Sequence, residues 1–180
     1  YDWTPGHRAV RFDFQTSYRG RYSDDLTNAA WVKSGCTVAL DATGPHGEPC
    51  STVTVTVDNG TVQQAVTSSG TAQMGFGWIR RKTGSGTVEL SMDGGSTFTD
   101  VTAMVGLAGG PFGLAYLRGA AADPTIVWRF GTAGDVFEMA LVNVSATYHV
   151  PPPAPSVAAD LLVSVEDLKI PVGTFPSAAA

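Results

Sequence analysis

The sequence predicts an all-β fold, namely a two-sheet antiparallel β-sandwich of jelly-roll type. Short segments with apolar residues at every second position recur along the chain, and clusters of turn-forming residues separate them. About nine such segments follow one another at regular spacing, which is typical of sandwiches and barrels. The chain of 180 residues contains 21 glycines, as expected of a fold rich in turns.

Composition argues against several classes of function. Charged residues make up 15% of the chain and the formal net charge is -5 at pH 7, so we expect no attraction to nucleic acid or to an anionic membrane. No apolar run reaches the roughly 18 residues that a membrane-spanning helix needs. The first five residues are neither a signal peptide nor a start at Met, so we expect a processed chain or a piece of a longer one.

The N-terminal segment, residues 1–22, is predicted to hold one strand, because apolar and polar residues alternate from Val10 to Phe14. The β-sandwich domain is assigned to residues 23–149. Its first segment is too short for a stable helix, and we expect a turn that places Trp31 in the core.

Two chain reversals are predicted in the first half of this domain. Turn residues at 44–49 follow a strand at Cys36–Leu40. The sequence Asp58-Asn59-Gly60 separates two alternating segments, 53–57 and 62–66. This arrangement predicts a β-hairpin.

Three consecutive antiparallel strands are predicted between residues 72 and 105. The first is the apolar run 74–79, and the second is the alternating segment 87–92. A tight turn at 93–95 leads to the third, because its glycines tolerate positive φ.

Residues 91–98 match the Asp-box pattern Ser-x-Asp-x-Gly-x-Thr, which occurs in sialidases and other β-propellers. In this pattern Ser91, Asp93, Gly95 and Thr97 form a structural turn in which the Asp carboxylate accepts backbone N–H groups. A propeller would repeat the motif in several blades, whereas this chain has one copy. The motif is therefore interpreted as structural and not catalytic.

The last part of the domain is predicted to hold two more strands. A long Gly-rich loop with at most one weak strand leads to the alternating segment 126–130. Residues 136–144 are nearly all apolar, which is expected of a strand covered on both faces at the centre of a sheet.

Residues 150–180 are predicted to form a Pro-rich linker and a C-terminal arm. The prolines of 151–155 favour a stiff polyproline conformation. Apolar residues then alternate from Leu161 to Val165, too few to form a core alone. We expect this arm to add as a strand to a sheet edge of a neighbouring subunit in a homo-oligomer. The alternative is that it closes its own sandwich.

The order of several motifs resembles the carbohydrate-binding-module-type jelly-roll domains of bacteriophage tail, fibre and other virion proteins. The motifs are Thr27–Lys33, Gly44–Gly47, Gln63-Gln64, Gly77–Arg81, Gly86–Met92, Asp123–Thr125 and Gly134–Glu138. His46 stands where this pattern usually has Asp, and the two cysteines are unusual for it.

The resemblance implies a non-enzymatic structural module of a phage tail, fibre or head surface. Such a module would be assembled in the host cytoplasm and become extracellular in the mature virion. Other virion proteins are the implied partners, together with host-surface polysaccharide if the module binds glycan. The alternative is a carbohydrate-binding module of a secreted glycoside hydrolase.

Catalytic and metal-binding patterns are missing from the sequence. The three histidines lie far apart without zinc-ligand spacing, and no serine occupies a Gly-x-Ser-x-Gly elbow. Carboxylates on strands occur singly, so an acid/base pair is not indicated. No cofactor is expected, although Asp135 and Glu138 with backbone carbonyls would suit calcium.

A glycan site would combine aromatic faces with flanking polar groups. The candidates are Trp78, Tyr116 and Trp128 with Arg80, Arg118 and Arg129. Both tryptophans have a competing interpretation as core residues, because each alternates with small or polar neighbours. Tyr116, in the predicted Gly-rich loop, is the stronger surface candidate.

Cys36 and Cys50 leave two interpretations open. A disulfide would close a loop of about 15 residues and contribute on the order of 3 kcal/mol. For a protein assembled in a reducing cytoplasm, the sequence favours two free thiols on neighbouring strands.

Overall fold

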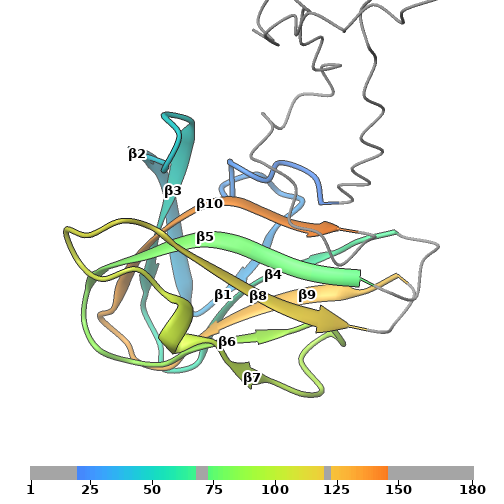
Figure 1. The fold of residues 1–180 in the computed structure, drawn as a ribbon. Coiled ribbons are helices and arrows are strands. Elements are labelled where there is room, and N and C mark those ends of the chain that lie inside the picture. Colours follow the sequence, from blue (N-terminus) through green and yellow to red (C-terminus); the bar gives the residue numbers. More distant parts are fainter. Residues whose placement is uncertain (1–19, 68–72, 120–122, 146–180) are drawn as a thin grey trace, which may run out of the picture. The chain divides into compact units, whose positions relative to one another are not determined.

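The computed structural model describes residues 20–67, 73–119 and 123–145. Within these ranges the chain forms two antiparallel five-stranded sheets and a single 3₁₀ turn, η1 (Thr102–Met104) (Figure 1). The predicted two-sheet β-sandwich is therefore confirmed. The strand expected near Val10 and the arm at 150–180 lie outside the described residues.

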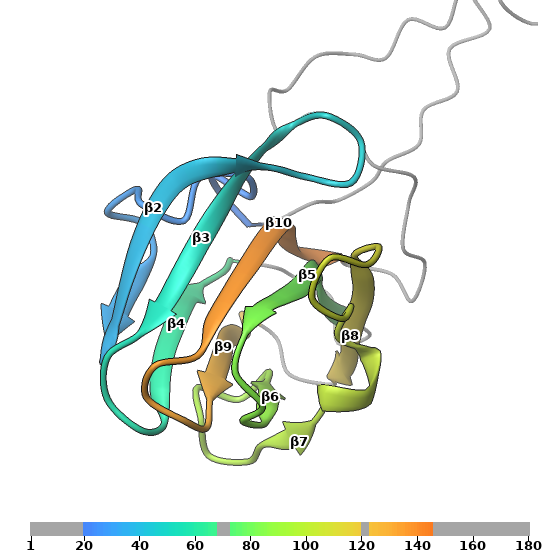
Figure 2. The same ribbon diagram turned by 90° about the vertical axis from the view of Figure 1, so that its left-hand side faces the viewer.

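The first sheet, called sheet A, has the strand order β2-β3-β10-β5-β8. Figure 2 shows these strands side by side. Their bounds are β2 (Cys36–Thr43), β3 (Pro49–Val55), β10 (Val136–Ser145), β5 (Gln73–Thr83) and β8 (Gly113–Gly119). The strand predicted for residues 136–144 is β10, and its predicted central place in a sheet is confirmed.

The second sheet, called sheet B, has the strand order β1-β4-β9-β6-β7. Its strands are β1 (Val32–Ser34), β4 (Gly60–Ala65), β9 (Thr125–Phe130), β6 (Val88–Ser91) and β7 (Thr99–Asp100). The chain thus passes repeatedly between the two sheets, and most strands that are consecutive in the sequence do not pair with each other.

The hairpin predicted at Asp58-Asn59-Gly60 is wrong. β3 lies in sheet A and β4 in sheet B, so this turn carries the chain across the sandwich. The same holds for β5 and β6, which were expected to pair. Alternation of apolar and polar residues shows that a strand has one buried face. The same alternation is found in two strands that pair within one sheet and in two strands that lie in opposite sheets, so it does not identify the partner of a strand.

Two other predicted reversals are present. β2 pairs with β3 through the loop at 44–48, with Val38 opposite Val53. β6 pairs with the short β7 through the Asp-box turn, with Leu90 opposite Thr99.

The core lies between the inner faces of the two sheets. Trp31 is 1% exposed, so its predicted place in the core is confirmed. Phe130 of β9 and Phe137 of β10 meet across the core with ring centroids 4.9 Å apart. The other large buried members are Leu26, Ile79, Leu90, Ile126, Trp128 and Met139.

The Asp-box turn has the hydrogen bonds that its pattern predicts. The Ser91 hydroxyl donates to Asp93 Oδ1 over 2.6 Å and accepts the Gly95 N–H over 2.9 Å. The Thr97 N–H and hydroxyl donate to the two oxygens of Asp93 over 2.9 and 2.6 Å. Gly94 and Gly95 both have positive φ, at 74° and 89°, which explains the need for glycine.

These hydrogen bonds predict an acid-sensitive turn. The Ser91 hydroxyl, followed by the Thr97 hydroxyl and N–H, holds the pKa of Asp93 well below its ordinary value of 3.8. A carboxylate with a depressed folded-state pKa stabilises the fold above the unfolded-state pKa, and this contribution is lost as the pH falls toward the folded-state value. We expect the melting temperature of Asp93→Asn to lie below that of the wild type at pH 5 to 7, and the difference to begin to narrow below about pH 4 and to shrink further as the pH falls.

Thermal unfolding followed by circular dichroism from pH 7 to pH 2.5 would check this prediction, over a pH range set by the ordinary carboxyl pKa. A difference in melting temperature that stays constant with pH would contradict it, because it would show that the charge of Asp93 has no part in the turn.

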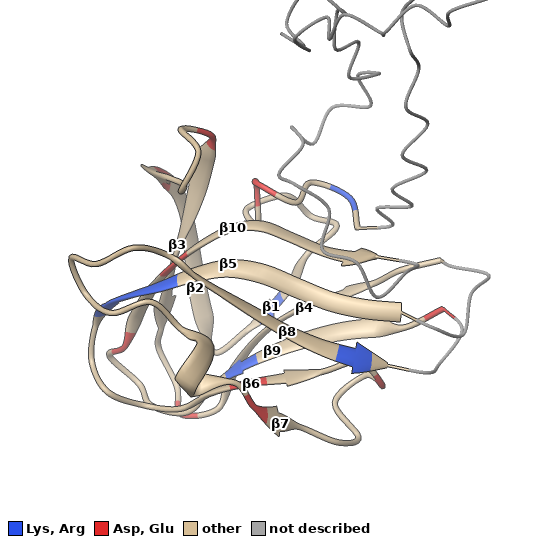
Figure 3. Ribbon diagram, viewed as in Figure 1, with Lys and Arg blue, Asp and Glu red and all other residues tan. Residues whose placement is uncertain are grey.

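Charged side chains of both signs are interspersed over the sandwich. Figure 3 shows basic and acidic positions on several strands and loops of the described residues. Among the described residues, no helix is long and apolar enough to cross a membrane.

Candidate functional site

The outer face of sheet A points away from sheet B. On this face, aromatic and charged side chains lie in two adjacent rows that run across the strands. Gly77 and Ile79 of β5 face the core, because Gly77 lies against Trp128 and Ile79 is a buried core residue. Trp78 and Arg80 therefore point outward. Strand register aligns Trp78 with Ala140 and Leu114 in one row.

The second row contains Thr52, Glu138 and Arg80. Glu138 of β10 is aligned with Thr52 of β3 on one side and with Arg80 of β5 on the other. The two rows are neighbours along β5 and β10, so the Trp78 ring lies next to the charged pair.

Two aromatic rings meet over the first row. The His46 ring, from the loop between β2 and β3, lies edge-on to Trp78 with centroids 5.5 Å apart and planes at 86°. Tyr116 lies on the same outer face, aligned with Phe76, and is 40% exposed. Its predicted surface position is thus found, but on strand β8 and not in a loop.

The Arg80 guanidinium already forms hydrogen bonds with other groups of this chain. Its Nε donates to Glu138 Oε2 over 2.7 Å, and one Nη donates to the same oxygen. The other Nη donates to the Gly110 carbonyl over 3.1 Å, and the guanidinium lies 4.5 Å above the Phe112 ring. Arg80 therefore holds the loop before β8 against sheet A, and we assign it a positioning role in place of the ligand contact predicted from the sequence.

Two buried oxygen atoms on this face have no hydrogen-bond partner. They are Oε1 of Glu48, in the β2–β3 loop, and Oγ1 of Thr52. Buried polar atoms nearly always have partners, and leaving one without costs about 1–3 kcal/mol. Nε1 of Trp128, in the core, also has no partner, so a missing partner does not by itself mark a binding surface.

Trp128, predicted as a ligand contact, is a core residue. Its side chain is fully buried and belongs to the core cluster. Trp78, for which the same two interpretations were open, is half-buried on the outer face. The core interpretation therefore holds for Trp128 and not for Trp78.

The predicted arginines are divided between the two sheets. Arg118 lies on the outer face of sheet A, aligned with Met74 and exposed. Arg129 lies on sheet B, where its Nε donates to Glu89 Oε2 over 2.6 Å and its guanidinium lies 3.6 Å from the Phe98 ring centroid. The hydrogen bond to Glu89 raises the pKa of Arg129. Arg129 thus holds Phe98, at the end of the Asp-box turn, against sheet B. It does not lie with Trp78 on the outer face of sheet A.

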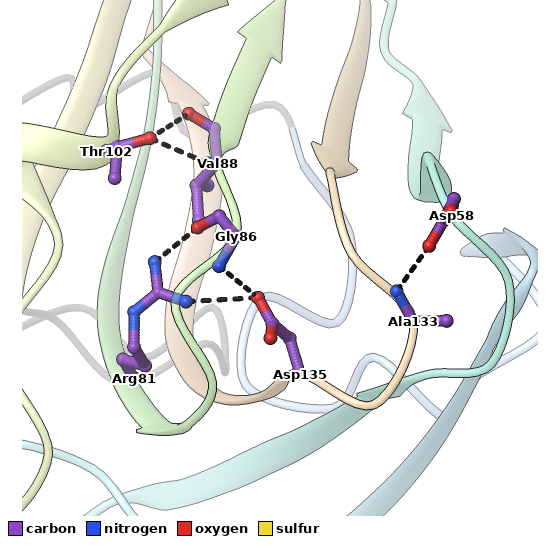
Figure 4. Close-up of polar contacts among 7 residues, drawn as sticks. All are labelled: Asp58, Arg81, Gly86, Val88, Thr102, Ala133 and Asp135. Atoms are coloured by element: carbon purple, nitrogen blue, oxygen red, sulfur yellow. Dashed lines mark hydrogen bonds and ion pairs between the residues drawn. The ribbon is translucent and has the colours of Figure 1, made fainter.

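The calcium hypothesis for Asp135 and Glu138 is not supported. Asp135 Oδ2 accepts hydrogen bonds from Arg81 over 3.1 Å and from the Gly86 N–H over 2.8 Å (Figure 4). Glu138 is paired with Arg80 and lies 3.7 Å from the Lys82 ammonium. Across the described ranges, no group of three or more His, Cys, Asp and Glu side chains is placed to hold a metal ion.

The two cysteines are free thiols, so the disulfide considered from the sequence is not formed. Cys36 is aligned with Val55 and Cys50 with Ala42, at opposite ends of the β2–β3 pair. Burial raises the pKa of Cys36 to about 11 and that of Cys50 to about 12. Both thiols are therefore protonated and unreactive at neutral pH.

No protein-family model matches the chain, and no curated protein matches it. Among solved structures, it is similar to the CBM22-1-GH10 modules of Clostridium thermocellum endo-1,4-beta-D-xylanase 10B complexed with xylohexaose, with a TM-score of 0.49 and 14% identity. That match covers 76% of this chain and 29% of the xylanase chain.

Two further structures show weaker similarity. The enzymatically active domain of bacteriophage CBA120 tailspike protein 4 matches with a TM-score of 0.43 and 13% identity, over 67% of this chain and 20% of that one. The C-terminal CBM6 of the laminarinase LamC from Zobellia galactanivorans matches with a TM-score of 0.41 and 5% identity, over 63% of this chain and 90% of that one. At these identities and TM-scores, the similarities carry no conclusion about function.

Proposed function

We propose that the sandwich is a non-catalytic carbohydrate-binding module and that the outer face of sheet A is its binding face. One observation carries the proposal: three aromatic rings lie on the outer face of sheet A, with His46 edge-on to Trp78 at 5.5 Å between centroids and with Tyr116 40% exposed on the next strand. A sugar ring offers an apolar C–H face and a rim of hydroxyls. Aromatic rings on an outer face are complementary to the C–H face.

Tyr116 extends the aromatic part of this face. It stands one row beyond Trp78, on the neighbouring strand β8. Its 40% exposure leaves ring surface available for a second sugar unit. A chain of sugars, and not a single one, is therefore the ligand that this spacing favours.

The absence of catalysis is part of the proposal. Glycoside hydrolysis generally needs two carboxyl groups, one of which donates a proton. Glu138 is engaged by Arg80 and Lys82, and Asp135 by Arg81. Because these two carboxylates are bound in ion pairs, we do not expect either to act as a catalytic acid or base. Release of reducing sugar from a bound polysaccharide would overturn this part.

The module is further proposed to belong to a phage virion, as a tail, fibre or head-surface component. The support is the order of sequence motifs described above, and the proposed partners are other virion proteins and further copies of the chain. Portal, capsid or tail genes beside the gene would support this assignment. A catalytic glycosidase domain in the same reading frame would instead support the module of a secreted enzyme.

Substitutions on the binding face are expected to separate binding from stability. Tyr116→Ala and Trp78→Ala should each weaken polysaccharide binding by about 10- to 100-fold, the loss seen when an aromatic anchor is truncated. The melting temperature of Tyr116→Ala should change little, because this ring is exposed. A glycan array followed by isothermal titration calorimetry on the retained glycan would measure both.

Phe98→Ala is the matched control, because this ring lies against Arg129 on sheet B. It should bind the same glycan as tightly as the wild type. If both outer-face variants keep their affinity while the control loses it, the binding face is on the other sheet.

A further inference from the structure

We infer that the chain forms a two-fold symmetric dimer in which β2 pairs antiparallel with β2 of a second copy, centred on Val38. Formation of this dimer does not depend on carbohydrate binding. Three features of the structure support it, namely the unpaired outer edge of β2, the lack of protective residues along that edge, and the fit of the edge to its own copy.

Strand β2 lies at the end of sheet A and pairs with β3 on one side only (Figure 2). The register of this pair continues to Gly35 and Thr56, where the Thr56 N–H donates to the Gly35 carbonyl over 2.8 Å. Hydrogen-bonded and non-hydrogen-bonded pairs alternate along an antiparallel ladder. The backbone N–H and C=O groups of Cys36, Val38 and Leu40 therefore point away from β3. Within the described ranges, no backbone hydrogen bond reaches them.

The segment Cys36–Leu40 lacks the residues that normally keep sheet edges apart. Its sequence, Cys-Thr-Val-Ala-Leu, contains no charged residue and no proline. Proteins generally protect an edge by keeping it short or by placing charges or prolines on it. The other edge strands of the two described sheets have such protection, since β1 has three residues including Lys33, β7 has two, and β8 carries Arg118. Among these edges, β2 is therefore the one open to pairing.

The outer edge of β2 is complementary to itself. When Val38 lies opposite Val38 of the second copy, Cys36 lies opposite Leu40, so the residues whose backbone groups point outward meet one another. Each such pair can exchange an N–H and a C=O with the other copy. The one charged residue of β2, Asp41, lies beyond the paired segment, so the pairing brings no like charges together.

Pairing also removes apolar surface from water. The side chains of Cys36 and Val38 pack partly against the core, and Leu40 is 45% exposed. These three side chains lie on the same face of β2, because they alternate with Thr37 and Ala39. In the dimer, Leu40 of each copy lies beside Cys36 of the other, and such cross-strand neighbours stabilise a sheet.

The symmetry of the dimer has a consequence for binding that does rest on the proposed function. A two-fold axis perpendicular to the sheet joins two five-stranded sheets into one and keeps the outer faces of both copies on the same side. The two proposed binding faces could then contact one polysaccharide surface together. Linked sites of this kind gain avidity without any new contact to the ligand.

Cysteine cross-linking tests the pairing and its register. A cysteine in place of Leu40 would lie directly opposite Cys36 of the other copy, at a Cα separation that a disulfide can span. Leu40→Cys should therefore give a disulfide-linked dimer on a non-reducing gel after mild oxidation. The wild type and the double variant Cys36→Ser/Leu40→Cys should not, because identical positions of the two copies are then four residues, or about 13 Å, out of register. Leu107→Cys is the matched control, since Leu107 is 76% exposed in the loop before β8 and should not cross-link.

Sedimentation equilibrium measures the dimer without a cross-link. A single pair of edge strands is a small interface, so the dimer fraction of the wild type should rise with concentration up to about 1 mM. Leu40→Lys places a charge beside the partner strand and should weaken dimerisation by about 10-fold or more. Leu107→Lys should leave dimerisation unchanged.

Several outcomes would overturn the dimer. A wild type that stays monomeric up to about 1 mM, or a Leu40→Cys variant that does not cross-link, would do so. Cross-linking of the double variant would overturn the register centred on Val38. A dimer that Leu40→Lys does not weaken would mean that another surface or the C-terminal arm joins the copies. Each of these outcomes leaves carbohydrate binding to be decided by the glycan array.

Discussion

Replacing Trp128 by alanine is expected to lower the free energy of unfolding by about 3–5 kcal/mol, the usual loss for a fully buried tryptophan. The Trp128 side chain is 0% exposed at the centre of β9. A Cβ at Gly77 would come within 3.1 Å of the Trp128 ring, so the indole packs directly on the backbone of sheet A. The two sheets cannot close the resulting cavity without moving many other contacts. Urea denaturation should show a lower midpoint with an unchanged m-value.

Trp78→Ala provides the comparison within the same chain. Trp78 is half-buried on the outer face, so its truncation should reduce stability by less than half as much as truncation of Trp128. Its main effect should be on polysaccharide binding. Equal losses of stability for the two variants would mean that the outer face is as closely packed as the core.

The different positions of these two tryptophans show how far the alternation of residues can be interpreted. In β9, Ile126, Trp128 and Phe130 alternate with Thr125, Val127 and Arg129, and the bulkier set faces the core. In β5, Gly75 and Gly77 face inward, so Met74, Phe76 and Trp78 lie on the opposite face, where Met74 and Phe76 are each 2% exposed and Trp78 is half-buried. Period-two alternation separates the two faces of a strand but does not say which face meets the other sheet.

The two inward-facing glycines of β5 are the sequence feature that could have predicted the orientation of this strand. A Cβ at Gly75 would collide with the Met92 side chain and come within 2.9 Å of Ile126, and Gly77 lies against Trp128. Glycine in a strand interior often marks the close approach of another group. In β5 it marks the places where large side chains of sheet B need room. The glycines of β5 therefore pointed to Trp78 as the outward residue.

The segments that form strands were largely predictable, and their partners were not. β2, β3, β4, β6, β9 and β10 all fall where alternation or apolar runs place them. The β2–β3 pair is local, and its turn residues predict it. The alignment of β10 between β3 and β5 joins residues far apart in the sequence, and no short-range pattern encodes it.

The same limit applies to the candidate site. Arg80 and Glu138 are 58 positions apart, and they meet only because β5 and β10 are neighbours in a specific register. Glu48 follows Gly47 in a turn, where a carboxylate is ordinarily exposed. Its Oε1 is buried because the loop folds back over Ala140, a contact that composition and periodicity do not encode. The Asp box, in contrast, is a local motif and was predicted in full.

Asp135→Asn is expected to lower the free energy of unfolding by about 3–5 kcal/mol, because it removes one partner of a buried ion pair and leaves the other charge unpaired. The side chains of Asp135 and Arg81 are 3% and 11% exposed. Arg81 also donates to the Gly86 carbonyl over 2.5 Å and lies 4.8 Å from the Phe137 ring centroid. In Figure 4 the Arg81 guanidinium and the Gly86 backbone both meet Asp135 at one end of the sandwich.

A double-mutant cycle with Arg81→Met would show that the loss arises from the unpaired charge. Each single variant leaves one buried charge without its partner, whereas the double variant buries neither. The double variant should therefore be more stable than the sum of the single losses implies, by about 1–3 kcal/mol, because replacing both partners of a buried pair is much less unfavourable than removing one. Chemical denaturation of the four proteins at pH 7 would measure this coupling. Strictly additive losses would mean that Asp135 acts through its hydrogen bond to the Gly86 N–H, and that Arg81 contributes by packing on Phe137.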